Sequence, residues 1–344
     1  MQRLPFLLAL ISPITLAQSP TPPPATQQSN TPYSLSTQSN LVFVPTEVRT
    51  RKGELIFGLT ADKFVVEDTG KPQRLHLEED LGNDGLSLVI VAQCSGAAAM
   101  ELQKLRGLPT MLDNLTGDAP HEIAVVTFGN DPTLVGDFTS DPNTLATGLA
   151  EIRPCDESNV RTFDAVAYAN SLLEHRPSNL RHAILLLSET RDHGSHTDPK
   201  QLIATLGRSN TVVDAVAFSP GRDEVLEELK HGGGGSIVEL FFLALNALKK
   251  NAAHELAILS GGEYANFTSQ RGFDQALNRL ANRIHNFYNI SFQPTAATTE
   301  PGFHPLHVTV PDYPDAVIRA RGSYWSGPPP SIDAAPFPAP PHTP

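Results

Sequence analysis

The chain has 344 residues, 40% of them hydrophobic, which is enough for one large or two modest domains with buried cores. It carries 25 Lys and Arg residues against 37 Asp and Glu residues, a formal net charge of −12 at pH 7. This composition excludes a wholly disordered chain, and the acidic charge argues against a nucleic-acid partner because phosphate binding needs clustered positive charge.

The first residues have the features of a secretory signal. Residues 1–17 contain one basic residue, a short apolar run and then Thr15 and Ala17, small residues where a signal peptidase acts. We therefore expect a signal peptide over 1–17 and export to the periplasm, the cell envelope or the exterior. The run is too short to cross a membrane, and no later segment is long and apolar enough.

Two segments have compositions that do not support a packed core. Residues 18–40 are rich in Pro, Ser and Thr, which predicts a flexible linker, and residues 326–344 are rich in Pro, which predicts a disordered tail. The folded part is therefore expected to cover about residues 41 to 325.

Both ends of the folded part show β patterns. Residues 41–80 alternate apolar and polar side chains between tight turns, which is typical of short antiparallel strands. The segments 288–294, 306–310 and 316–325 alternate in the same way. Because each set is too short to cover an apolar face alone, we expect 41–80 and 288–325 to pair in a small β subdomain.

The middle of the chain, residues 81–287, alternates between strand and helix patterns. Such an alternation predicts an α/β domain with a doubly wound, mostly parallel sheet. Nearly continuous apolar runs predict buried strands at 86–92, 122–129, 182–188 and 211–218. Helices are predicted at 98–115, 141–152, 163–175, 198–208, 222–230, 237–249 and 271–287. The 237–249 helix is apolar on most sides, so it either joins the core or forms an interface.

The stretch LVIVAQCSGAAA, residues 88–99, runs from a buried strand through a turn of small residues into a helix. Ligands of open parallel sheets bind beyond the carboxyl ends of the strands. The turns after residues 92, 129, 188 and 218 are therefore the candidate site, and the first of them offers no carboxylate.

The chain resembles the von Willebrand factor type A (vWA) fold, and specifically the exported bacterial proteins with a VWFA-related domain. The similarity covers about residues 41 to 325 and depends on the order and spacing of several pieces rather than on one motif. The pieces are LVFVPTEVRTRKGELIFGLTADKFVVEDTGKPQ, AVVTFGNDPTLVGDFTSDPNTLATGLAEIRP, FDAVAYA, AILLLSE, KNAAHELAILSGGEY, GFDQALNRLANRIHNFYNISFQP and PDAVIRARGSYW.

The resemblance implies a metal-ion-dependent adhesion site that binds Mg²⁺ through Asp-x-Ser-x-Ser, a Thr and a further Asp. In this chain those positions are Gln93, Ser95, Ala97, Val160 and Glu189, so the serine at 95 is the one residue kept. Mg²⁺ requires oxygen ligands, and the amide, methyl and isopropyl groups remove most of them. We therefore expect a degenerate, metal-free site with no cofactor.

Two metal-binding alternatives remain open. In the first, a shifted loop lets Thr162 act with Ser95 and Glu189 as ligands. In the second, polar residues of the same loops form a different metal site; these residues are Asp156, Asp192, His193, His196 and Asp198.

The resemblance also predicts a disulfide between Cys94 and Cys155. These are the two cysteines of the chain, and in a type A fold the loops that contain them are neighbours. In an oxidising compartment such a pair is expected to be bonded, so that a covalent link replaces the metal in holding the loops together.

Catalysis is an alternative to binding. Residues 92–96 fit the pattern of a hydrolase nucleophile elbow with Cys94 as the nucleophile, and Asp192 with His231 or His254 would complete a triad. Hydrolase elbows normally follow several earlier strands of the sheet, whereas this one would follow the first.

We therefore predict an exported, non-catalytic, adhesion-type interaction module with an unknown protein partner. A structural component of the cell envelope without a ligand site is the remaining interpretation.

Overall fold

The computed structural model describes residues 41–78, 85–96, 98–108, 112, 120–177, 180–218, 244–248, 250–285, 287–294 and 302–327. The expected signal peptide, linker and tail lie outside these residues, apart from 326 and 327. So do Ala97, His231 and the predicted 222–230 helix. Of the predicted 237–249 helix, 244–248 are described, and 244–247 are helical. No helix of the described residues is long and apolar enough to span a membrane.

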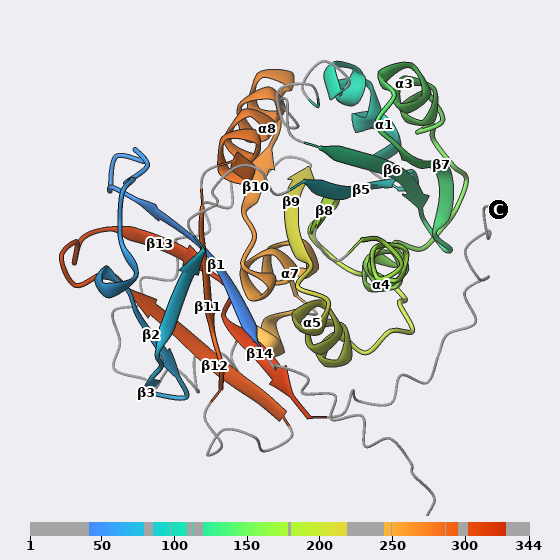
Figure 1. Ribbon diagram of the computed structural model, residues 1–344. Helices are drawn as coiled ribbons and strands as arrows, with labels where there is room; N and C mark the ends of the chain where they lie inside the picture. The colour runs from blue at the N-terminus through green and yellow to red at the C-terminus, as the bar shows by residue number, and fades with distance from the viewer. Residues whose placement is uncertain are drawn as a thin grey trace, which may run out of the picture. The chain divides into compact units, whose positions relative to one another are not determined.

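A mostly parallel sheet forms the centre of the α/β part (Figure 1). Its strand order is β10-β9-β8-β5-β6-β7, with β5 hydrogen-bonded in parallel to both β6 and β8, and with β7 antiparallel to β6. The doubly wound α/β prediction is therefore confirmed. The strands are β5 (Leu86–Gln93), β6 (His121–Phe128), β7 (Thr133–Thr139), β8 (Arg181–Ser188), β9 (Val212–Phe218) and β10 (Tyr264–Phe267).

Helices cover both faces of this sheet. In Figure 1, α4, α5 and α7 lie on one face and α1, α3 and α8 on the other. The side chains of β5 alternate accordingly: Val89 and Val91 pack toward α4, whereas Leu88 and Ile90 pack toward α8. The helices are α1 (Ala98–Glu101), η2 (Leu102–Gly107), α3 (Pro142–Ala150), α4 (Thr162–Leu173), α5 (Pro199–Arg208), α7 (Ala252–Ser260) and α8 (Gln270–His285).

Helix starts follow the local sequence. The Asp141 carboxylate accepts a hydrogen bond from Thr144 N at 2.8 Å, and Pro142 occupies the first turn of α3. Asp198 caps α5 in the same way, by accepting from Lys200 N and Gln201 N. Of the predicted 98–115 helix, Ala98–Glu101 is α-helical and Leu102–Gly107 forms a 3-10 helix.

The terminal segments form two four-stranded antiparallel sheets, ordered β13-β1-β11-β4 and β14-β12-β2-β3. Each sheet combines strands from both ends of the chain, as predicted: Val44 of β1 pairs with Ile290 of β11, and Val66 of β2 with Val308 of β12. Their apolar side chains share one core. The elements are β1 (Val42–Arg49), η1 (Ala61–Lys63), β2 (Val65–Asp68), β3 (Lys71–Pro72), β4 (Leu75–Glu78), β11 (Tyr288–Phe292), β12 (Gly302–Thr309), β13 (Val317–Ala320) and β14 (Ser323–Ser326).

Charged side chains connect these sheets to the α/β part. Arg319 Nη1 lies 3.7 Å from Glu47 Oε1 and 3.4 Å from Glu263 Oε2, which follows α7. Arg321 is fully buried, and its Nη1 donates to Gly207 O and to Asn210 Oδ1, at the carboxyl end of α5. Burial lowers the pKa of Arg321 to about 10, a value at which the guanidinium stays charged at neutral pH.

Candidate functional site

Loops from neighbouring strands meet at the carboxyl ends of β5, β6 and β8. We call residues 93–96, 129–131, 155–162 and 189–198 the top loops. Cys94 N donates to Phe128 O at 2.8 Å, and Arg161 N donates to Gly129 O at 2.9 Å. A side chain at Gly129 would come within 3.0 Å of the Ser95 Cβ atom. The loops after β5 and β6 and the loop before α4 therefore pack directly against one another, whereas the turn expected after residue 218 lies outside the described residues.

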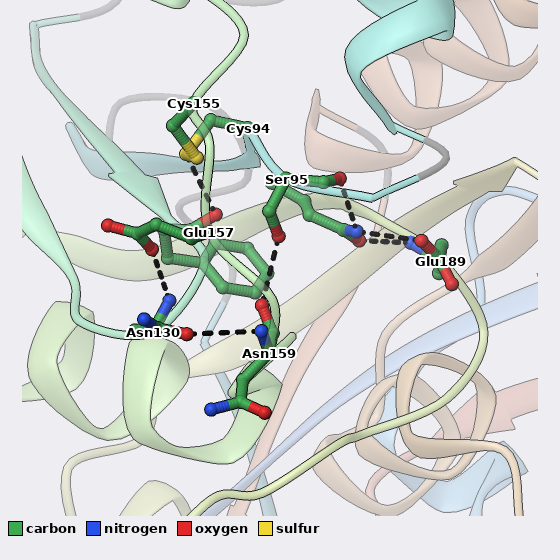
Figure 2. The surroundings of a disulfide bond; sticks show 9 residues. Cys94, Ser95, Asn130, Cys155, Glu157, Asn159 and Glu189 are labelled. Atoms are coloured by element: carbon green, nitrogen blue, oxygen red, sulfur yellow. Dashed lines mark hydrogen bonds between the residues drawn. A yellow bond between two sulfur atoms is a disulfide. The ribbon is translucent and has the colours of Figure 1, made fainter.

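A disulfide joins Cys94 to Cys155, as predicted (Figure 2). The two Cα atoms are 5.2 Å apart, and Cys155 N donates to Cys94 O at 3.0 Å. The Glu157 carboxylate lies close to both sulfur atoms. A disulfide offers neither a thiolate ligand nor a thiol nucleophile, so this group has no chemistry for a metal or for a hydrolase while the bond is intact.

The side chain of Gln93 connects the first loop to the third. It is fully buried, and its Nε2 donates to Ser95 O at 3.0 Å and to Glu189 Oε1 at 2.9 Å. Its Oε1 accepts from Glu189 N at 2.8 Å. The amide thus uses both of its donor hydrogens and its acceptor within the protein.

The other positions of the implied adhesion site also lie here. Gly96 has φ +59, and a Cβ atom on it would be 3.0 Å from Glu189 Oε1, 3.6 Å from Gln93 Nε2 and 3.9 Å from Val160 Cγ2. Ser95 Oγ donates to Asn159 O at 2.9 Å. The structure therefore brings together Gln93, Ser95, Val160 and Glu189, with an isopropyl group in place of one hydroxyl.

A second set of polar contacts, which the sequence reasoning missed, fastens the loop after Cys155 (Figure 2). Glu157 Oε2 accepts from Asn130 N, and Asn130 Oδ1 accepts from Asn159 N at 3.0 Å. One signal was available, because Asn130 directly follows one of the turns chosen for inspection at the end of β6.

The residues proposed for a different metal site have structural partners in most cases. Asp192 Oδ1 accepts from Phe163 N at 3.2 Å and from the Ser195 hydroxyl. The backbone of His193 pairs with Val160, and Asp198 caps α5. Asp156 is exposed.

The carboxylate of Asp164, in the first turn of α4, anchors the third loop. It is 2% exposed and accepts from His196 N at 3.0 Å and Thr197 N at 2.8 Å, while His196 Nδ1 lies 3.3 Å away. Thr162 Oγ1 is buried and has no hydrogen-bond partner among the described residues, so it is not hydrogen-bonded to Ser95 or Glu189.

Two groups with shifted pKa values, Glu122 and His182, lie at the opposite end of the sheet, where β6 and β8 begin. Burial alone would raise the pKa of Glu122, but hydrogen bonds from Arg176 and from Ser87 lower it overall. Burial lowers the pKa of His182, against a smaller opposing effect of backbone hydrogen bonds. Ser87 pairs with Glu122 on one side and with His182 on the other, so this charged row supports the sheet far from the top loops.

Comparison with known proteins agrees with this geometry. Residues 92–191 match the von Willebrand factor type A domain family. No curated protein sequence matches the chain.

Several solved structures are similar. Proximal thread matrix protein 1 of the mussel byssus has 14% identity and a TM-score of 0.42, and the match covers 64% of this chain and 50% of that protein. BatB of Bacteroides thetaiotaomicron has 14% identity and a TM-score of 0.41, over 58% of this chain and all of BatB. A mutant of the PilB minor pilin of Streptococcus sanguinis has 14% identity and a TM-score of 0.40, over 60% and 63%. The chain thus spans about half the length of the mussel protein. On the family match, residues 92–191 are similar to von Willebrand factor type A domains, and they lie within the mostly parallel α/β sheet.

Proposed function

We propose that the protein is an exported, non-catalytic interaction module that binds a protein partner through its top loops without a divalent cation. The observation that supports this most directly is the way the loops are held. The disulfide fixes the loop after β5 to the loop before α4, and Gln93 fixes it to the loop after β8. The loops thus form a braced surface at the place where ligands of such sheets bind.

The donor set of these loops does not suit the cation that the fold family implies. A hard cation such as Mg²⁺ needs several oxygen ligands in near-octahedral geometry. Here Gln93 turns its NH₂ group toward Glu189, the Ser95 hydroxyl donates to a backbone carbonyl, and the side chain of Val160 has no polar atom. We therefore assign no step of binding to a metal.

Export is the second part of the proposal. The signal-like residues 1–17 support it, and so does the disulfide, because structural disulfides persist in oxidising compartments. We place the protein in the periplasm, in the cell envelope or outside the cell. The disulfide also argues against the hydrolase alternative, since it leaves Cys94 without a thiol.

Affinity capture tests the binding surface. The top-loop variant combines Asp156→Ala with Arg191→Ala, and the matched control combines Lys52→Ala with Glu54→Ala in the turn after β1. All four residues are exposed, and each pair removes one acidic and one basic side chain. Envelope and external fractions are passed over each immobilised protein, and the recovered proteins are quantified by mass spectrometry.

We expect at least one protein to be recovered by the wild type and the control, with or without EDTA, and to be lost with the top-loop variant. Equal recovery by both variants would refute the top loops as the binding surface. Loss of recovery in EDTA would refute cation-independent binding.

A further inference from the structure

The amide of Gln93 has a defined orientation. A backbone N–H can only donate, so Glu189 N must face the oxygen of the Gln93 amide, at 2.8 Å. The opposite end is therefore the NH₂ group, whose hydrogens point to Ser95 O and Glu189 Oε1. These two oxygen atoms come from the first and the third loop.

We propose that this NH₂ group takes the bridging place that a divalent cation has in a metal-dependent adhesion site. A cation holds such loops together by attracting oxygen atoms from both, and the positively polarised amide hydrogens attract the oxygen atoms of Ser95 and Glu189 in the same way. This inference rests on the proposed function, because it explains how the same top loops are held without an ion.

The packing around the amide leaves no separate place for an ion between these oxygen atoms. Gln93 is fully buried, and the backbone of Gly96 approaches Glu189 and Gln93 so closely that a Cβ atom there would lie 3.0 Å and 3.6 Å from their side-chain atoms. Mg²⁺ binds oxygen at about 2.0–2.1 Å, so it would have to displace the amide nitrogen from its two acceptors.

A bridge made by a side chain, unlike one made by a bound ion, should not depend on the concentration of divalent ions. An ion leaves when it is chelated, whereas the Gln93 amide remains attached to β5. The first and third loops should therefore keep one arrangement at any divalent-ion concentration, and the wild-type protein should have no cation site there.

Three variants of the full chain test the bridge. Gln93→Glu keeps the size of the side chain but sets a second carboxylate against Glu189. Gln93→Leu removes the polar group without adding charge. The exchange variant, Gln93→Glu with Glu189→Gln, restores one amide opposite one carboxylate. Melting temperature is measured with and without Mg²⁺ or Mn²⁺, and Mn²⁺ binding is measured by electron paramagnetic resonance.

We expect the wild type to show no saturable Mn²⁺ binding at this site and no shift in melting temperature with either ion. Gln93→Glu should melt several degrees lower, because two carboxylates then face each other, and Mg²⁺ or Mn²⁺ should recover little of the loss, because the new carboxylate fills the place of the amide. Gln93→Leu should melt lower with no recovery. The exchange variant should melt above Gln93→Glu but below the wild type in the absence of metal, because like charges no longer face each other while Ser95 O has lost its donor.

Two results would overturn the inference. One is single-site Mn²⁺ binding by the wild type that Glu189→Gln abolishes, which remains decisive even if Gln93→Glu does not fold. The other is a melting temperature of Gln93→Leu equal to that of the wild type. All of these measurements use the purified protein alone, so their failure is distinct from a failure of partner capture.

Discussion

Replacing both cysteines should cost the protein about 4 kcal/mol of unfolding free energy. The disulfide closes a loop between residues 61 positions apart, and the chain-entropy relation gives roughly 14 cal/mol/K for the restriction of the unfolded chain. At 25 °C this amounts to about 4 kcal/mol. A folded chain of roughly 280 residues has an unfolding entropy near 0.6 kcal/mol/K, so the melting temperature should fall by about 7 °C.

The top loops should keep their structure in the variant, so a difference in unfolding free energy between variant and wild type reflects the disulfide itself. Ser at position 94 would find an acceptor, because Cys94 Sγ lies 3.2 Å from Phe128 O. The loop before α4 keeps two hydrogen bonds: Ser95 Oγ donates to Asn159 O, and Asn159 N donates to Asn130 Oδ1. The predicted loss therefore arises in the unfolded state, where the chain becomes free to expand.

Urea unfolding of the Cys94→Ser, Cys155→Ser double variant and of the wild type provides the test. We expect a lower midpoint and a steeper dependence on urea for the variant, because its unfolded chain exposes more surface. The wild type treated with reductant should behave like the variant, and reductant should leave the variant unchanged. A loss below about 1 kcal/mol with an unchanged urea dependence would refute the reasoning.

Three further predictions concern other parts of the fold. Burial lowers the pKa of His182, so its stabilising effect is complete above the unfolded pKa of about 6.5 and is lost as the pH falls through the folded pKa. His182→Gln should make the free energy of unfolding, measured by urea titration at several pH values, fall less steeply with falling pH. The same pH dependence in the variant and the wild type would contradict this. Asp164→Ala should destabilise the protein by about 3 kcal/mol and speed amide exchange in 191–198, since it removes the acceptor of that loop; unaltered exchange would count against this role. Gly262→Ala should cost more than about 3 kcal/mol in urea unfolding, because its Cβ would lie 1.9 Å from Val213 O, and a soluble variant of wild-type stability would disprove the clash.

The buried strands could be predicted because each is a nearly continuous apolar run in the sequence. The runs that became β5, β6, β8 and β9 are apolar at nearly every position, as expected for strands covered on both faces. Strand β7 was missed because TLVGDFT has a central glycine and an aspartate and is mostly half-exposed, and β10 because it has four residues. Both are edge strands, where the burial signal is weakest.

The sequence pattern did not predict that one alternating segment divides into two strands of different sheets. Residues 316–325 alternate like one strand, yet β13 ends at Ala320 and β14 begins at Ser323, in the other sheet. The alternation of side chains shows which residues share a face of a strand, but it does not show which other strand pairs with it. The break falls at the buried Arg321, whose partners at the end of α5 are more than a hundred residues earlier in the chain.

The candidate site was also predicted only in part. Its position followed from the ends of the strands, and the Cys94–Cys155 pairing followed from the resemblance. The bonds of Gln93 to Glu189 did not, because they depend on the orientation of one amide. The sequence shows an amide at position 93 where the resemblance implies a carboxylate, and the structure shows which atoms that amide contacts.

The pairing of β1 with β11 also sets an order of folding. Val44 meets Ile290, about 250 residues later, so the apolar face of β1 has no sheet partner until nearly the whole chain has been synthesised. The strands of the central sheet, by contrast, are all complete before β11 is made. The α/β part can therefore fold first, while β1 waits as an unpaired, aggregation-prone strand. A protein built this way depends on protection of β1 until β11 has been made.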